Sequence, residues 1–434
     1  MNFAIPPGTR LSQLSADQDT RLFDRGRAQD AGVAAVVAKL IADVRARGDD
    51  ALREQARRFD GVESLHIEVP RSEWQGALDA LDAQVRAGLE QAAGNIATFH
   101  RAQLPTVLEV EVEPGVLLGR RADPLQRVAV YAPGGRAAYP SSVLMGVVPA
   151  RVAGVGEVVV CSPAGPDGRP PATVLAACAI GNADRLFAIG GAGAIAAAAY
   201  GTATVARVDK IVGPGNAYVT EAKRQVTGVV AIDCPAGPSE VLVIADDSAN
   251  AEFVAYELFA QAEHDPDAAS VLVSTSRELI EQVAGMIDRE IASQPRRDVI
   301  RAALAARGAL LLATDEAEML SFSTRYAPEH VTLYVRAPRA ALARTFNAGT
   351  VFLGNATSVA FGDYLTGANH VLPTAALARS YSGLSIFDFI RWTTYQQVAA
   401  GAAARLAGPT AVLADAEGLP AHARAARLRI AGGA

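Results

Sequence analysis

The sequence predicts an α/β protein with two parallel sheets, on the basis of three observations. From residue 127 onward, short apolar strands alternate with Gly-rich turns and helical stretches, and this rhythm runs twice along the chain. Strands that alternate with helices are typical of parallel sheets covered on both faces. A chain of 434 residues also exceeds the usual size of one hydrophobic core, which favours two main domains. Half of the residues are hydrophobic and a fifth are charged, as in soluble globular proteins.

The elements follow in order. Residues 31–60 and about 74–98 have apolar positions at helical spacing and form a predicted helical lead-in. The first predicted strands are 128–131, 158–161, 186–189, 210–212 and 229–232. Parallel sheets of this kind bind ligands at the carboxyl ends of their strands. The second predicted strands are 241–244, 271–273, 310–312, 331–335 and 351–353. Beyond Asn355 we expect no strand, but a Gly/Ser/Thr-rich segment, a helix from Phe387 to Gly401 and an alanine-rich tail.

These elements predict two Rossmann-like but incomplete parallel-sheet domains with small helical extensions at both ends. The expected parts are an N-terminal extension (1–30), a discontinuous α/β domain (31–126 with 239–383), a second α/β domain (127–238) and a helical tail (384–434). The tail contains Glu417 and His422 but has only a short core of its own. It is therefore a candidate to complete a site elsewhere, including one on another subunit.

Composition narrows the classes of partner. A net charge of −6 without a run of Lys or Arg argues against nucleic acid or an anionic membrane surface, and favours a small molecule. Cys161, Cys178 and Cys234 are too few and too scattered for a disulfide framework or a four-sulfur zinc site, which fits a reducing cytoplasm. No export signal and no apolar run of membrane-spanning length is present, so a cytoplasmic location is expected.

Polar clusters indicate where chemistry could take place. Of the six histidines, four lie in such clusters: Gln261/Glu263/His264, Glu329-His330, Asp363 through His370, and Glu417 through His422. Gln261 and His264 are three apart near the end of a predicted helix, so they would share one face and could hold a metal ion. The alternative is a solvated helix end. The adjacent Glu329 and His330 could act as two acid–base groups, unless their side chains point apart.

Two Gly-rich turns are candidates for cofactor binding. Gly191-Ala192-Gly193 with Ala196 follows a strand and matches G-x-G-x-x-A, and Asp209 lies further on, as in dinucleotide-binding turns. A structural turn explains it equally well. The turn Val212 to Ala217 also joins a strand to a helix, and its free N–H groups could bind a phosphate or carboxylate.

Six motifs of the sequence are jointly specific: residues 210–216 (KIVGPGN), 233–240 (DCPAGPSE), 260–264 (AQAEH), 327–330 (APEH), 362–364 (GDY) and 369–374 (NHVLPT). Through these motifs the chain resembles histidinol dehydrogenases throughout its length. The resemblance implies a zinc-dependent, NAD-using enzyme that oxidises L-histidinol through L-histidinal to L-histidine in two hydride transfers. It also implies a homodimer with intertwined tails, in which Glu417 and His422 enter the partner's site.

The resemblance assigns roles residue by residue. His330 would take the hydroxyl proton, and Glu329 would activate water to hydrate the aldehyde. The implied zinc ligands are Gln261, His264, Asp363 and His422. The implied substrate contacts are Ser239, Gln261, His264, His330, Asp363, His370, Glu417 and His422. The implied NAD contacts are Tyr131 and Asn216.

The chain departs from the family's usual pattern at a few positions. Gly193 stands where the family usually has Gln beside the cofactor, and the lost hydrogen bond is expected to weaken NAD binding up to about tenfold. Ala368 replaces a usual Pro, and Ala375-Ala376 replace a Gly-containing turn. Three alternatives stay open: a dehydrogenase of another primary alcohol such as a sulfonated propanediol, a zinc hydrolase, and a non-catalytic zinc scaffold.

Overall fold

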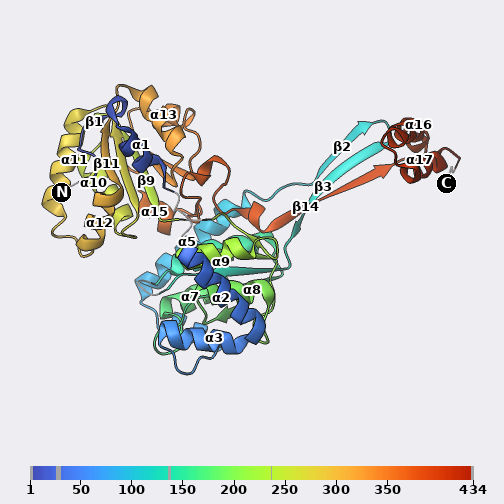
Figure 1. Ribbon diagram of the computed structural model, residues 1–434, viewed down its shortest axis with the longest axis horizontal. Coiled ribbons are helices and arrows are strands. Elements are labelled where there is room, and N and C mark those ends of the chain that lie inside the picture. Colours follow the sequence, from blue (N-terminus) through green and yellow to red (C-terminus); the bar gives the residue numbers. More distant parts are fainter. Residues whose placement is uncertain (1–2, 26–30, 135–137, 236, 432–434) are drawn as a thin grey trace. The chain divides into compact units, whose positions relative to one another are not determined.

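The computed structural model describes residues 3–25, 31–134, 138–235 and 237–431. The chain divides into a larger unit, Met1–Ala102 with Gln126–Phe389, and a smaller unit, Gln103–Leu125 with Ile390–Ala434. The larger unit contains two parallel sheets with helices packed on them, so the predicted α/β class is confirmed (Figure 1). Within the described ranges, no helix has the length and apolar character needed to cross a membrane.

Sheet A has six strands in the order β1-β11-β10-β9-β12-β13, and every pairing in it is parallel. Its strands are β1 (Thr9–Arg10), β9 (Glu240–Ala245), β10 (Ala269–Ser274), β11 (Gly308–Leu312), β12 (His330–Tyr334) and β13 (Thr350–Leu353). Alternate residues of β9 enter opposite cores, as the two-residue period of a strand requires. Val241 and Val243 belong to one core, and Leu242 and Ile244 belong to the other.

Helices cover both faces of sheet A (Figure 1). The core on one face includes residues of α10 (Ala251–Ala262), α11 (Arg277–Glu290), α12 (Arg297–Arg307) and α15 (Val359–Tyr364). The core on the other face includes residues of α1 (Ala16–Phe23), α13 (Glu316–Tyr326) and α14 (Pro338–Leu342). The described residues 3–25 pack on sheet A, whereas a separate extension was expected for 1–30. Strand β1 pairs with β11, and Leu22 of α1 is buried in the core.

Sheet B is parallel, with its five strands in the order β6-β5-β4-β7-β8. The strands are β4 (Arg127–Tyr131), β5 (Glu157–Cys161), β6 (Arg185–Phe187), β7 (Lys210–Val212) and β8 (Ala231–Ile232). The connecting helices are α6 (Pro140–Ala153), α7 (Ala172–Gly181), α8 (Gly191–Tyr200) and α9 (Ala217–Val226). The chain places β5 and β6 on one side of β4, and β7 and β8 on the other. The carboxyl ends of β4 and β7 therefore flank a switch point, where open parallel sheets bind ligands.

The helical lead-in packs on the helices of sheet B. It consists of α2 (Ala31–Arg47), α3 (Asp49–Gln55), the π-helical η2 (Ala56–Asp60), α4 (Arg71–Asp79) and α5 (Ala83–Arg101). Helix α2 packs on α8 and α9, α4 on α7, and α5 on α6. This differs from the expected grouping of 31–126 with 239–383. Helical spacing shows that a helix has an apolar face, but it does not show which sheet that face will cover.

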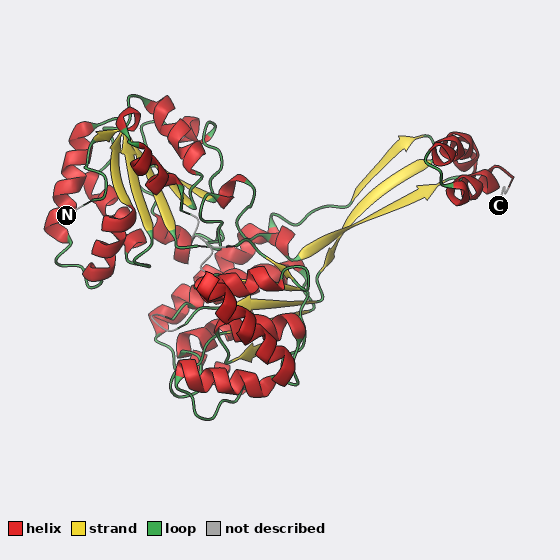
Figure 2. Ribbon diagram, in the orientation of Figure 1, coloured by secondary structure: helices red, strands yellow, loops and turns green. Residues whose placement is uncertain are grey.

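The structure of the smaller unit differs from two expectations, a helix from Phe387 to Gly401 and no strand beyond Asn355. It contains the antiparallel sheet β14-β3-β2, formed by β2 (Leu108–Glu113), β3 (Val116–Pro124) and β14 (Ile390–Val398), followed by α16 (Ala400–Ala416) and α17 (Pro420–Ala431) (Figure 2). Strand β14 occupies most of the predicted helix from Phe387 to Gly401, so that helix and the end of the strands at Asn355 were both wrong. The sequence of β14 is rich in aromatic and β-branched residues, which favour strands.

Candidate active site

The candidate catalytic residues lie at the amino edge of sheet A. His330 is the first residue of β12 and Glu240 is the first residue of β9. Because His330 pairs with Val241 in the parallel register, Glu329 comes beside Glu240. Ser239, a half-buried residue, immediately precedes β9. Parallel sheets usually bind ligands at the carboxyl ends of their strands. These residues lie at the opposite edge of sheet A.

The backbone of Glu240 holds both members of the pair. Its N–H donates to Oε2 of Glu329 at 2.7 Å, and its carbonyl accepts from Nδ1 of His330 at 2.9 Å. In the neutral imidazole, Nδ1 therefore carries the proton and Nε2 carries the lone pair. Nε2 is buried and has no hydrogen-bond partner among the described residues. The ring is thus oriented with its basic nitrogen available for a substrate proton.

Two carboxylates lie near the His330 ring. Oε2 of Glu329 is 3.5 Å from Nδ1, and Oδ1 of Asp363 is 3.7 Å from Nε2. Burial alone lowers the pKa of His330, but the charges of these two carboxylates raise it by more, to about 9. A base with this pKa is more often deprotonated, and therefore more active, in mildly alkaline solution.

Asp363 brings a second histidine to the site. It lies in α15, and its backbone carbonyl accepts from Nδ1 of His370 at 2.8 Å. The other ring nitrogen of His370, Nε2, is 3.4 Å from Oγ of Ser142 in α6. Burial lowers the pKa of His370 despite the nearby Asp363 carboxylate, which favours the neutral ring. The structure thus brings together Glu329, His330, Asp363 and His370.

Gln261 and His264 follow one another at the end of α10. The helix ends at Ala262, and His264 lies in the following turn, where its N–H donates to the carbonyl oxygen of Gln261 at 3.3 Å. The Gln261 side chain is buried, and its Oε1 has no hydrogen-bond partner among the described residues. The His264 side chain is exposed. A buried amide oxygen normally needs a partner, so a bound cation would satisfy it.

The donor set fits zinc in kind. Zinc accepts imidazole nitrogen and carboxylate oxygen, which His264 and Asp363 provide, and the free oxygen of Gln261 adds a third donor. No cluster of three or more His, Cys, Asp or Glu with metal-site geometry is found in the described part of the chain. The expected set supplies only two side chains of those types in the larger unit. The remaining expected ligand, His422, is exposed on α17 of the smaller unit, and Glu417 is exposed at the end of α16.

The two expected NAD contacts lie at the switch point of sheet B. Tyr131 ends β4, and its hydroxyl accepts from the N–H of Gly191, the first residue of α8, at 3.1 Å. Burial raises the pKa of Tyr131 to about 12, so the phenol is neutral. Asn216 is exposed and caps α9, because its Oδ1 accepts from the N–H groups of Tyr218 and Val219 at 3.0 and 3.2 Å.

The backbone polar groups of Gly213, in the turn after β7, are hydrogen-bonded within the protein. Gly213 has φ +115°, and a Cβ at this position would collide with the carbonyl oxygen of Tyr131, so only glycine fits. Its N–H donates to Oδ2 of Asp233 at 2.7 Å, and its carbonyl accepts from Nζ of Lys223 at 3.0 Å. The sequence led us to expect that the N–H groups of this turn could bind a phosphate or carboxylate. The N–H of Gly213 is not available for this, because it is bonded to Asp233.

Gly193 lies beside the Gln55 side chain. It is buried in α8, and a Cβ built on it would collide with Oε1 of Gln55 in α3. The dinucleotide-like pattern also fails at Asp209, whose Oδ2 accepts from the N–H groups of Gln126 and Arg127 at the start of β4. A Gln at position 193 would therefore have to displace the Gln55 side chain, and its expected contact with NAD stays a prediction. The amide of Gln55 fills that space.

Some functional candidates gave no signal in the sequence. Glu240 belongs to a motif quoted above, but its role comes from its backbone and from the strand register. Arg25 binds Glu240 across 215 residues of sequence, and Ser142 approaches His370 across 228. No local pattern predicts contacts at such separations.

The fold and site define an α/β enzyme with a buried carboxylate–imidazole pair at one sheet and a nucleotide-type switch point at another. Comparison with known proteins narrows this class. The family model described as histidinol dehydrogenase matches residues 23–430. The chain belongs to the histidinol dehydrogenase family and is an oxidoreductase.

Individual relatives agree over nearly the whole chain. Histidinol dehydrogenase of Methanosarcina mazei is 47% identical over 421 residues, covering 97% of both chains. That of Nitrosomonas europaea is 48% identical over 403 residues, covering 92% of this chain and 93% of the relative. The crystal structure of histidinol dehydrogenase from Elizabethkingia anophelis superposes with a TM-score of 0.92 at 34% identity, covering 96% of each chain.

Proposed function

We propose that the chain oxidises L-histidinol through L-histidinal to L-histidine, the last two oxidations of histidine biosynthesis, with NAD as hydride acceptor and zinc as bound metal. The observation that carries this proposal is the arrangement of Glu329 and His330. Both are fixed by the backbone of Glu240, and Nε2 of His330 has no partner among the described residues. When bound, NAD would accept the hydride at each oxidation, and zinc would hold the imidazole and amino nitrogens of the substrate.

The two residues of the pair have separate tasks. His330 takes the proton of the substrate hydroxyl on Nε2, because the bond of Nδ1 to Glu240 leaves Nε2 as the basic nitrogen. Glu329 takes a proton from water, which adds to the aldehyde and forms the hydrate for the second oxidation. Ser239 and His370 contact the substrate. Both members of the pair are buried, which limits the access of bulk water to them.

Zinc would be held by Gln261, His264 and Asp363 of one chain and by His422 of the partner subunit. Glu417 of the partner subunit would contact the substrate. Support for a homodimer comes from the smaller unit, where Glu417 and His422 are exposed together with large apolar side chains. Val412 and Leu413 on α16 are each 67% exposed. Apolar surface of this kind is typical of a subunit interface.

NAD would bind at the switch point of sheet B, beside Tyr131 and Asn216. The carboxyl ends of β4 and β7 offer the geometry that open parallel sheets use for nucleotides. A cytoplasmic location is part of the proposal, because all three cysteines are free and buried, as in proteins of reducing compartments.

Two other activities are less well supported. A related dehydrogenase for a sulfonated propanediol would act on a substrate without an imidazole, and would have no use for a metal site that holds two nitrogen donors. A zinc hydrolase would need Glu329 but not His330 in its present orientation. Full-length similarity to histidinol dehydrogenases favours the first proposal over both.

The test is an assay of NAD reduction by absorbance, with histidinol and with a sulfonated propanediol as alternative substrates. We expect histidinol to be oxidised, a chelator to abolish the reaction, and added zinc to restore it. Oxidation of the propanediol alone would identify the related dehydrogenase. Absence of NAD reduction with histidinol in the zinc-loaded protein would overturn the proposal.

A further inference from the structure

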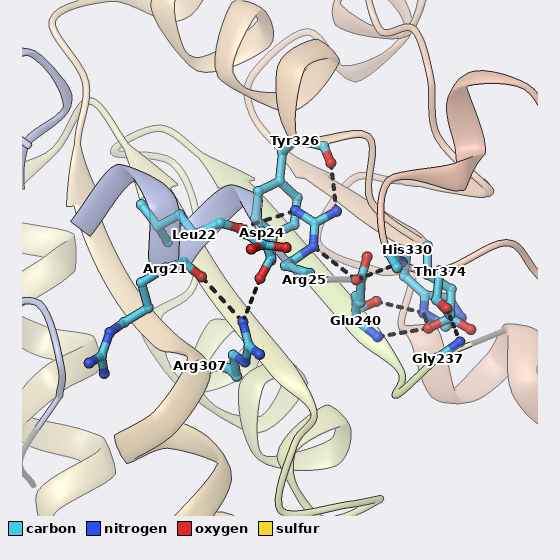
Figure 3. Close-up of polar contacts among 12 residues, drawn as sticks. Arg21, Leu22, Asp24, Arg25, Gly237, Glu240, Arg307, Tyr326, His330 and Thr374 are labelled. Carbon is cyan, nitrogen blue, oxygen red and sulfur yellow. Dashed lines mark hydrogen bonds and ion pairs between the residues drawn. The ribbon is translucent and has the colours of Figure 1, made fainter. Parts of the chain in front are cut away.

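A buried arginine lies next to the catalytic pair without touching it. The side chain of Arg25 is only 4% exposed, although the residue lies just after α1. Its Nε donates to Oε1 of Glu240 at 2.9 Å, and its Nη2 donates to the carbonyl oxygen of Tyr326 at 2.6 Å. The guanidinium also stacks 3.4 Å from the centroid of the Tyr326 ring (Figure 3). All three contacts use the planar fork that distinguishes arginine from lysine.

The first partner of Arg25 is the residue that orients the pair. Through its backbone, Glu240 binds the carboxylate of Glu329 and Nδ1 of His330. Its side-chain Oε1 accepts from Arg25 and also from the N–H of Ala375, at 2.9 Å. A displacement of Glu240 would therefore move the groups that hold both Glu329 and His330.

The second partner of Arg25 is Tyr326, which lies shortly before the catalytic pair in the sequence. Tyr326 ends α13, and only Ala327 and Pro328 separate it from Glu329. Ala327 has φ 50°, a left-handed conformation that is unfavourable for a residue with a side chain. Such conformations persist when surrounding contacts determine them. The bond from Arg25 to the Tyr326 carbonyl is one such contact, directly before the strained residue.

We propose that Arg25 is a positioning residue for both oxidations, because it ties the start of β9 to the turn before β12 and so fixes Glu329 and His330 relative to each other. The inference rests on the proposed function. Arg25 touches neither member of the pair in any hydrogen bond of the described residues, so its effect is transmitted through Glu240 and Tyr326.

The test compares Arg25→Lys and the double variant Arg25→Gln/Glu240→Gln with Arg21→Gln as the matched control. Arg21 is an exposed arginine on α1, and its side chain points away from the cluster (Figure 3). The double variant removes both buried charges, because Arg25→Gln alone would leave the Glu240 charge without a partner. Arg25→Lys keeps the charge but cannot reproduce the fork.

We expect kcat to fall at least about tenfold for both histidinol and histidinal in both Arg25 variants, while KM for NAD stays within about twofold. Arg21→Gln should match the unsubstituted chain. The melting temperature of Arg25→Lys should lie close to that of the unsubstituted chain, although its kcat stays low. A purely structural role would predict that the two quantities change together. In a His330→Asn background, the same Arg25 substitutions should change the residual rate of histidinol oxidation to histidinal by less than about twofold, because the base of that step is gone.

Three results would count against the inference. Folded Arg25→Lys with kcat within about twofold of the unsubstituted chain would overturn it, and so would an equal fold-loss in the His330→Asn background. If the unsubstituted, zinc-loaded chain does not oxidise histidinol, the proposed function fails and this inference fails with it. An active chain with insensitive Arg25 variants refutes the positioning role alone.

Discussion

Substituting Glu329 by Gln should separate the two oxidations. The side chains are nearly the same size, and the amide oxygen of Gln can still accept the N–H of Glu240 that binds Glu329 at 2.7 Å. The bond changes from a charged to a neutral one, a difference of about 1 kcal/mol. Relief of repulsion between the Glu329 and Glu240 carboxylates offsets part of this loss. Above the His330 pKa of about 9, where the ring is neutral and no ion pair is lost, we therefore expect the free energy of unfolding to change by no more than about 1 kcal/mol.

The effect on activity should be much larger and confined to one step. Loss of a general base lowers the rate of its step about 10²–10⁴-fold. Glu329→Gln should therefore slow histidinal oxidation by about that factor, while histidinol oxidation to histidinal should stay within about tenfold, because His330 is still held by the Glu240 carbonyl. His330→Asn should slow both steps.

The assay is single-turnover absorbance of reduced NAD, run separately with histidinol and with histidinal. The Glu329→Gln protein should give a fast phase with histidinol that corresponds to one hydride, and almost no fast phase with histidinal. An equal loss with the two substrates would refute the division of labour. A fall in the melting temperature of many degrees would instead show that Glu329 is mainly structural.

Three further predictions concern the rest of the molecule. Gly193→Gln should lower the melting temperature, because its side chain would displace the buried Gln55, and Gln55→Ala in the same protein should restore part of the loss; a stable single variant with an altered KM for NAD would contradict this. Burial lowers the pKa of His100 below the usual 6.5, so the unfolded chain binds a proton at this residue at a higher pH than the folded chain does. The contribution of neutral His100 to stability should therefore be full above pH 6.5 and be lost as the pH falls through the folded pKa. Melting curves of His100→Gln should show a weaker dependence on pH in that range. Lys223→Met should lower the free energy of unfolding in urea by about 3–5 kcal/mol, because it leaves Asp233 buried without its ion-pair partner; a loss below about 1 kcal/mol would show that Asp233 is neutral in the folded chain.

Much of the larger unit could be predicted because its strands are short apolar runs buried on both faces. Each predicted strand from 128–131 to 351–353 corresponds to a strand of sheet A or sheet B, with small shifts at the ends. Strands β2 and β14 lack this signal. Every residue of β2 is exposed and β14 is mostly exposed, so neither strand contains a continuous run of apolar residues. Burial, rather than strand propensity alone, made the other strands visible.

The candidate site was predictable as a set of residue types but not as an arrangement. Adjacent Glu329 and His330 indicated acid–base chemistry, and the structure shows that both side chains turn toward the Glu240 backbone. That orientation follows from the register of β9 and β12, which no local pattern contains. The same limit explains Arg25, whose contacts cross most of the chain, and Gly193, whose neighbour Gln55 comes from another helix.

The most direct test of the central claim is the number of NAD molecules reduced per molecule of histidinol. Complete conversion of a limiting amount of histidinol by the zinc-loaded protein, with NAD in excess, is followed by absorbance, and the product is identified by chromatography. If one site carries out both oxidations, two NAD molecules are reduced per histidinol and histidine is the only product. One NAD per histidinol, with free histidinal accumulating, would contradict the account.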